Sequence, residues 1–292
     1  MSEATINTDA ATHDGQVGRH GKCQEEYVMN KLLTGYKKVN INPPLQIGIC
    51  GYFVPRFAQG FLDDICASAF ALECDGERVV ILSLDACILE SHLVARYCAA
   101  IEKATGISKN KIFLSNTHSH TTPLFTPGDM FEAPEEPVLK YADFVEERLI
   151  DAVKLAVMAI ADMKPGRMGF AVGHAPDRIA YIRRYKMKDG STMTCPPVND
   201  PDIVGPIGEL DQRVNVLRFD RENSRPFILV NYGVHADTVN GEMLSADWPY
   251  WMAKTLDLAL EGADCMFIGG AQGDVGSTNV HPDSADMNDT QI

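Results

Sequence analysis

The chain has 292 residues, of which 45% are hydrophobic, and a formal net charge of −14 at pH 7. A chain of this length and apolar content can bury a sizeable core, so we expect a globular, soluble protein. The acidic balance argues against nucleic acid and anionic membranes as partners, because both are bound through accumulated Lys and Arg side chains. A neutral or cationic small molecule stays open as the substrate.

The sequence predicts neither a secretory signal nor a transmembrane segment. Its N-terminal residues lack the short apolar core of a signal peptide, and no apolar run approaches the roughly 20 residues of a membrane span. We therefore expect a cytoplasmic protein. The eight cysteines are scattered without a C-x-x-C pair, so we interpret most of them as buried free thiols. Nothing in the sequence indicates an oligomeric state.

The chain begins with polar residues and continues as one unit. Residues 1–25 show no hydrophobic periodicity, which predicts a flexible N-terminal lead-in. Residues 26–292 contain no internal repeat, low-complexity tract or Pro/Ser-rich linker. This favours a single domain over the rest of the chain.

The first predicted elements are two strands and a helix. Residues 67–74 and 78–86 are apolar runs separated by a turn containing Asp-Gly, which predicts a β-hairpin. Residues 90–106 show helical spacing of apolar side chains, with Gly106 as the C-terminal stop. A strand is predicted next at 111–116.

The second half of the chain alternates strands and helices. After a Pro-rich loop at 123–137, residues 138–163 carry the longest helical pattern, which Pro165 closes. Further strands are predicted at 167–174, 178–187, 212–219, 227–235 and 264–270, and a helix at 248–262. Hairpins mixed with strand-helix-strand units indicate an α/β fold with mixed β-sheets and flanking helices, layered as an α/β/β/α sandwich.

Two histidines follow the strand at 111–116. His118 and His120 stand two residues apart in the segment SNTHSH. If the backbone stays extended, both side chains project to the same face, where one metal ion or one substrate could contact both. A polar strand end with no chemical role is the alternative interpretation.

His235 occupies the same kind of position, at the end of the apolar run FILVNYGVH. Active sites in open α/β sheets gather at strand ends, so two strands could bring distant imidazoles onto one ion. Imidazole ligands suit Zn²⁺. Two unrelated surface histidines are the alternative.

Three acidic residues lie at comparable positions, Asp85 after a strand, Asp247 in LSADWP, and Asp274 in a glycine-rich loop. Each could complete a coordination shell, orient an imidazole, or cap a helix or turn. We take them as candidate substrate-binding residues.

Arg183 and Arg184 stand side by side, so one of them faces inward if their segment is a strand. There it could bind a carboxylate or polarise a carbonyl. An exposed pair is the alternative.

Several motifs together resemble a known family, the neutral/alkaline non-lysosomal ceramidases. INPPLQIGICGY, LSNTHSHTTP, IAYIRRY, VNYGVHADTV, LSADWP and FIGGAQGDV occur in the order seen in the catalytic domain of that family, between about residues 41 and 280. The family hydrolyses the amide of N-acylsphingosine with a zinc ion and an activated water. The resemblance therefore implies a small-molecule or lipid amide as substrate and Zn²⁺ as cofactor.

The resemblance also assigns roles to individual residues. It implies that His118 and His235 ligate zinc, that His120 contacts the substrate beside the metal, and that Arg183 lines the same pocket. The family's loop has a serine directly after Gly-Asp-Val, where this chain has Gly276. A shift of one residue makes Ser277 the counterpart and a candidate catalytic residue.

The family's two remaining zinc ligands, a Glu and a Tyr, lie C-terminal to this loop. We therefore expect the chain to be the N-terminal part of a longer domain, or to use a different metal shell. His281, Asp283 and Asp286 are candidates for the second case. A metal-dependent hydrolase of another amide or ester, and a catalytically inactive fragment or binding module, are the alternative functions.

Overall fold

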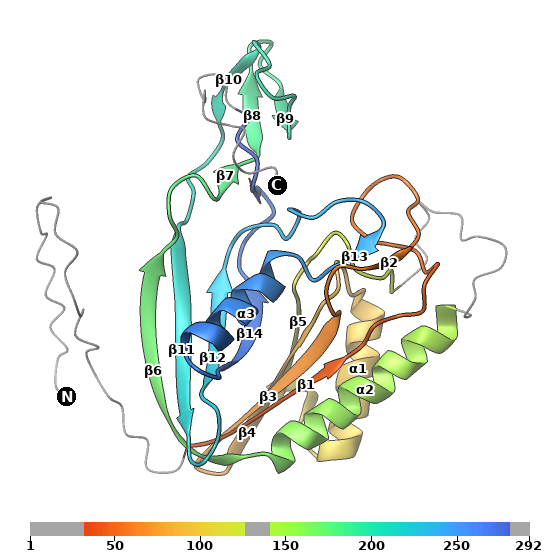
Figure 1. Ribbon diagram of the computed structural model, residues 1–292, viewed down its shortest axis with the longest axis vertical. Coiled ribbons are helices and arrows are strands. Elements are labelled where there is room, and N and C mark those ends of the chain that lie inside the picture. The colour runs from red at the N-terminus through yellow and green to blue at the C-terminus, as the bar shows by residue number, and fades with distance from the viewer. Residues whose placement is uncertain (1–31, 126–140, 281–292) are drawn as a thin grey trace, which may run out of the picture.

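The computed structural model of the protein describes residues 32–125 and 141–280. Eight strands form one mixed sheet in the order β14-β12-β11-β6-β1-β3-β4-β5 (Figure 1). The strands are, in chain order, β1 (Leu33–Asn40), β3 (Cys66–Cys74), β4 (Glu77–Leu84), β5 (Ile112–Asn116), β6 (Lys164–His174), β11 (Arg213–Arg221), β12 (Phe227–Tyr232) and β14 (Asp264–Gly269).

Neighbouring strands run antiparallel except at the two edges of the sheet. β3 and β4 form the predicted hairpin, with Ala67 opposite Leu84 and Cys74 opposite Glu77. β5 adds to β4 in parallel, and β14 adds to β12 in parallel. A parallel partner needs a crossover, which α1 (Ser91–Thr105) provides between β4 and β5, and α3 (Trp248–Ala259) between β12 and β14.

The sheet is divided into two halves at the junction of β1 and β6. These strands share two residue pairs in the described structure, Leu33 with Pro165 and Thr34 with Lys164. Beyond this joint the halves separate and fold over one another. The ends of β5 and β12 that lead to the histidines lie at the end away from the joint (Figure 1).

Aromatic side chains fill the space between the two halves. The ring of Phe70 on β3 stacks on Phe227 of β12 with centroids 4.3 Å apart, and Phe219 of β11 lies 4.8 Å from Phe70. Tyr36 of β1 packs against Phe227 and donates a hydrogen bond of 3.0 Å to the carbonyl of Cys265. Burial of several aromatic rings makes this inner core a major source of stability.

Helices cover the outer faces of both halves. α1 and α2 (Tyr141–Ala161) pack on β3 and β4, where alternate side chains such as Ala69 and Leu82 point outward. α1 buries Leu93, Tyr97 and Ile101, and it ends as predicted at Gly106, whose φ of 74° is left-handed. α3 packs on β12 and β14. The predicted α/β class is confirmed, and the layers follow the order α/β/β/α with one continuous sheet.

A small three-stranded sheet projects from the body (Figure 1). It consists of β8 (Arg184–Met187), β9 (Thr192–Thr194) and β10 (Ile203–Pro206). The prediction of one strand at 178–187 is wrong, because the chain breaks at Arg183. β7 (Tyr181–Ile182) pairs with β15 (Val275–Gly276), whereas β8 joins the projecting sheet. The remaining short strands, β2 (Gly60–Phe61) and β13 (Met243–Leu244), pair with each other, and η1 (Lys109–Lys111) is a 3₁₀ turn before β5.

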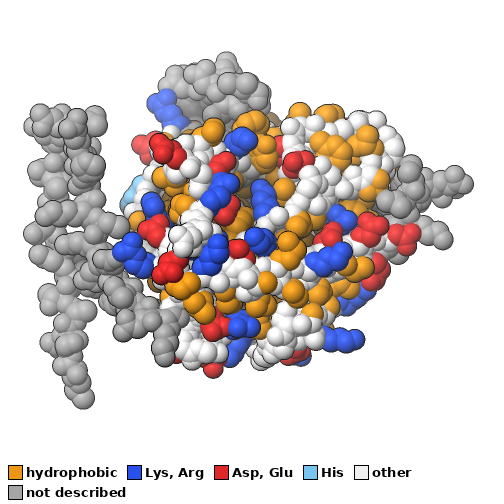
Figure 2. Space-filling model, turned by 60° about the horizontal axis from the view of Figure 1, so that its bottom comes forward, with side chains coloured by type: hydrophobic (Ala, Val, Ile, Leu, Met, Phe, Trp, Pro, Cys, Tyr) orange, Lys and Arg blue, Asp and Glu red, His pale blue; other side chains and the backbone are white. Residues whose placement is uncertain are grey.

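Some predicted features lie outside the described residues, namely the lead-in at 1–25, most of the loop at 123–137, and His281, Asp283 and Asp286. Among the described helices, none combines the length and apolarity that crossing a membrane requires. The face in Figure 2 carries Lys and Arg side chains interspersed with Asp and Glu rather than a continuous basic patch.

Candidate metal centre

Three histidines from two strand ends meet at the open end of the sandwich. The ring centroids of His118 and His235 lie 4.8 Å apart, those of His118 and His120 5.1 Å, and those of His120 and His235 5.4 Å. His120 and His235 are buried, and His118 is half-buried. The structure therefore brings together the residues that the sequence placed after β5 and after β12.

The backbone bends sharply to achieve this. The strand ends at Asn116, and His118 has a φ of 61°, in the left-handed region that non-glycine residues rarely adopt. The extended backbone expected through His118 is thus not present, although both side chains still reach one site. Backbone hydrogen bonds fix the bend, from His118 N to Ala86 O (2.9 Å) and from His120 N to Ala236 O (3.0 Å). Backbone strain of this kind clusters at functional sites.

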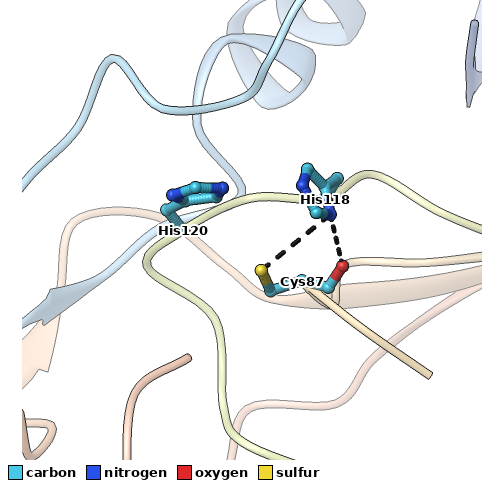
Figure 3. A group of neighbouring side chains, drawn as sticks. All are labelled: Cys87, His118 and His120. Atoms are coloured by element: carbon cyan, nitrogen blue, oxygen red, sulfur yellow. Dashed lines mark hydrogen bonds between the residues drawn. The ribbon is translucent and has the colours of Figure 1, made fainter. Parts of the chain in front are cut away.

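Backbone carbonyls fix the orientation of two imidazoles. Nδ1 of His118 lies 2.6 Å from the carbonyl oxygen of Cys87 (Figure 3). Nδ1 of His235 lies 2.6 Å from the carbonyl oxygen of Gln272 and 3.1 Å from that of Val275. A carbonyl only accepts, so each Nδ1 carries the proton and each Nε2 keeps a free lone pair. This is the outer-shell arrangement that holds metal-binding histidines in proteins.

The two buried imidazoles are neutral at neutral pH. Burial, followed by electrostatic interactions with the neighbouring His118 and Arg183, lowers the pKa of His120 from its ordinary value of 6.5 to about 4. Burial and the nearby charge of Arg183 lower the pKa of His235 to about 4 as well. A neutral imidazole is the form that binds a metal or accepts a proton. The donor set and its protonation therefore fit a zinc ion.

Cys87 is a fourth side chain at this site, and sequence reasoning missed it by grouping it with the buried thiols. Cys87, His118 and His120 each offer a ligand atom within 4.8 Å of the others. However, the thiol lies 3.9 Å from Nδ1 of His118, the nitrogen that already donates to the Cys87 carbonyl (Figure 3). Contact with Cys50 and burial raise the pKa of the Cys87 thiol, which disfavours the thiolate. Nε2 is therefore the nitrogen through which His118 could bind a metal. The position of Cys87 shortly after the C-terminal end of β4 could have indicated that it belongs to the site.

Arg183 lies at the edge of the histidine cluster, at the break between β7 and β8. Its Nε donates a hydrogen bond of 3.0 Å to the carbonyl of Gly273, and its charge lowers the pKa of both buried histidines. Arg184 is exposed. Arg183 therefore lies on the side of the histidines and Arg184 does not, although the two do not alternate along a continuous strand.

Two of the acidic candidates have protein partners of their own. Asp247 is buried, caps α3, and accepts hydrogen bonds from Thr238, Val239 and Trp248. The contact with Trp248 is that of a helix cap, and those with Thr238 and Val239 hold the loop after β12. Asp85 accepts a hydrogen bond of 2.8 Å from the backbone N–H of Cys66. It lines a partly open cavity of about 40 Å³, and desolvation of the carboxylate raises its pKa to about 7.

The remaining candidates belong to the loop around β15. Asp274 accepts a hydrogen bond of 2.8 Å from the backbone of Arg183 at its carbonyl oxygen. A Cβ added to Gly208 would lie 3.8 Å from the carboxylate oxygen Oδ2 of Asp274. Ser277 follows β15 directly and is half-buried. The roles of Asp274 and Ser277 stay predictions.

The fold resembles solved ceramidase structures. Neutral ceramidase from Pseudomonas aeruginosa superposes with a TM-score of 0.68 at 18% identity, and the match covers 89% of this chain and 41% of that one. A ceramidase structure described as complexed with C2 gives a TM-score of 0.66 at 20% identity, with the same coverage. The chain has the ceramidase fold. It spans less than half the length of these two proteins.

Neither a protein-family model nor a curated protein sequence matches this chain. At 18% to 20% identity the likeness establishes the fold alone. The chemistry must therefore be argued from the residues of the site.

Proposed function

We propose that the chain forms the metal-binding part of a zinc-dependent amide hydrolase that cleaves an N-acyl amide, N-acylsphingosine or a related lipid amide. The observation that carries the proposal is the histidine cluster. His118 and His235 come from different strands, and each has Nδ1 bonded to a backbone carbonyl and Nε2 free. The ceramidase fold supports the choice of an amide as substrate.

In this proposal His118 and His235 hold the metal through Nε2. Zinc, when bound, supplies a Lewis acid that polarises a carbonyl oxygen and lowers the pKa of a water molecule toward about 7. The two carbonyl contacts keep both rings oriented without any ligand, so little ordering is needed on binding.

His120 and Arg183 act on the substrate in this proposal. His120 is neutral at neutral pH, so its free ring nitrogen can accept a proton from the attacking water and return it to the leaving amine. The guanidinium of Arg183 stays charged, and it donates hydrogen bonds to the amide oxygen as negative charge develops there. His120 belongs to the histidine cluster, and Arg183 lies at its edge.

The test begins with metal content, which does not depend on the substrate. Purified protein is loaded with zinc, dialysed and assayed by elemental analysis, alongside His118→Ala, His235→Ala and the control His174→Ala, an exposed histidine on β6. We expect stoichiometric zinc in the parent and the control, and loss of at least tenfold in affinity in each of the other two. Equal zinc in all four proteins would overturn the metal site.

Activity is then measured on N-acylsphingosine and on soluble amides and esters side by side. We expect hydrolysis of the lipid amide that is lost on chelation and restored by zinc. Preference for a soluble ester would assign the site to a different hydrolase substrate. Full activity in chelator would contradict metal dependence.

A further inference from the structure

His120 has a buried ring nitrogen without a hydrogen bond in the described structure. Its Nδ1 is inaccessible to solvent, and the carboxylate oxygen Oδ1 of Asp237 lies 3.5 Å away. A buried N–H that lacks an acceptor costs free energy, so such an atom needs an explanation. In contrast, Nδ1 of both His118 and His235 already has a carbonyl partner.

Asp237 is held in place from the opposite side. The hydroxyl of Tyr52 donates a short hydrogen bond to the same oxygen, Oδ1. The Tyr52 ring also meets the edge of the His120 ring, with centroids 5.6 Å apart and planes at 84°. The carboxylate is therefore placed between a tyrosine hydroxyl and an imidazole nitrogen.

Arg56 contacts both Tyr52 and His120. Its guanidinium lies 4.2 Å above the Tyr52 ring and donates hydrogen bonds to the carbonyls of His120 (2.6 Å) and Cys50 (2.8 Å). Tyr52, His120 and Asp237 come from three segments of the chain; the buried Arg56 contacts Tyr52 and the backbone of His120, and Tyr52 in turn holds Asp237. Such support favours a defined orientation over a chance contact.

We propose that Asp237 is a positioning residue for His120, with Tyr52 setting the carboxylate, so that the proton of His120 stays on Nδ1 and Nε2 faces the site shared with His118 and His235. This inference rests on the proposed function, in which His120 transfers a proton. A carboxylate on the far nitrogen fixes both the tautomer and the ring orientation of a histidine base. A separation of 3.5 Å is longer than a hydrogen bond, and such contacts shorten when a ligand completes the site.

The first test measures the tautomer in metal-free protein and needs no activity. Long-range ¹H–¹⁵N spectra of ¹⁵N-histidine-labelled protein are recorded for the parent, Asp237→Ala, Tyr52→Phe and the control Asp211→Ala, which removes an exposed carboxylate paired with Arg213. We expect the Nδ1–H form of His120 in the parent and the control, and a mixture of tautomers in Asp237→Ala. An unchanged His120 tautomer in Asp237→Ala would overturn the proposal even if the protein hydrolyses amides.

The second test separates positioning from a purely structural role. We expect Asp237→Ala to lower kcat by about 10- to 100-fold with zinc content retained and KM changed by less than about threefold. Asp237→Asn keeps an acceptor oxygen and should recover part of that loss. Should Asp237→Ala not fold, Tyr52→Phe decides, because it removes one hydroxyl and should still broaden the His120 tautomer signals. Wild-type His120 signals in Tyr52→Phe would then overturn the proposal.

Discussion

Gly51 packs directly against His120, so that a Cβ on Gly51 would lie 2.5 Å from the Cβ of His120. Gly51 also has a φ of 112°, which side-chain-bearing residues rarely adopt. His120 can occupy its position because the neighbouring residue, Gly51, has no side chain.

Substitution of this glycine should displace His120 from the cluster. We expect Gly51→Ala to lower amide hydrolysis by at least tenfold, because its methyl group and His120 cannot occupy the same space. Gly76→Ala is the matched control, since Gly76 has a φ of 82° but open space around a Cβ. Circular dichroism and turnover of both variants are compared. Equal activity in the two variants would show that the close contact between residue 51 and His120 is not needed for turnover.

Arg183 should matter for turnover, whereas Arg184 should not. We expect Arg183→Ala to reduce kcat by about 10- to 100-fold, because a charged donor is lost beside the reacting carbonyl. It should also raise the pKa of His120 and His235, which the positive charge of Arg183 lowers. NMR titration of the histidines and steady-state kinetics check both effects. Arg184→Ala, at an exposed position, serves as the control, and a similar loss in that variant would argue against a specific role for Arg183.

Stability should depend on pH through two opposing contributions. His120 and His235 have a pKa of about 4 in the folded protein, below the ordinary 6.5. Between these values the unfolded chain binds more protons, so the free energy of unfolding falls as pH drops from 6.5 toward 4. Asp85 has a pKa of about 7, above the ordinary 3.8, so its contribution is present at low pH and is lost as pH rises through 7.

Asp85→Asn separates the two contributions. The variant cannot ionise at this position, so it should gain on the order of 1 to 2 kcal/mol relative to the parent between pH 5 and pH 8. Its loss of stability on acidification should be correspondingly steeper. Urea unfolding of metal-free protein at both pH values measures the difference. A difference between variant and parent that does not change with pH would contradict a raised pKa of Asp85 in the folded protein.

Gly276 should accept the serine that the ceramidase resemblance places after Gly-Asp-Val. A Cβ there would lie 3.7 Å from Cβ and Cδ of Arg183, which is ordinary van der Waals contact. We expect Gly276→Ser to change the free energy of unfolding by less than about 0.5 kcal/mol and to raise turnover. Thermal unfolding and kinetics test this. Unchanged turnover would indicate that Gly276 does not limit the reaction.

The sequence predicted those features that depend on local patterns. Alternation and turn chemistry located the β3-β4 hairpin, and helical spacing with Gly106 located α1. The strand-end positions of His118 and His235 were sufficient to suggest a shared site, and the bent sheet brings the ends of β5 and β12 together. β1 was not predicted, because its polar and apolar residues do not alternate regularly. It nevertheless joins the two halves of the sheet.

Other features depend on tertiary contacts and could not be read from local sequence. The left-handed bend at His118 is imposed by hydrogen bonds from distant segments. The contact of Asp237 with His120 depends on how two loops meet, and Asp237 alone resembles any polar loop residue. The break at Arg183 likewise arises because β7 pairs with β15, which lies nearly 100 residues later in the chain.

The narrow joint between β1 and β6 has a mechanical consequence. The two halves of the sheet share two residue pairs at one end, and the histidines lie at the other. An ion bound by His118 and His235 at once would connect the halves at the end where the sheet does not. Its binding would oppose their separation, so the binding free energy would add to the free energy needed to open the sandwich. A bound metal would then stabilise the fold as well as take part in the reaction.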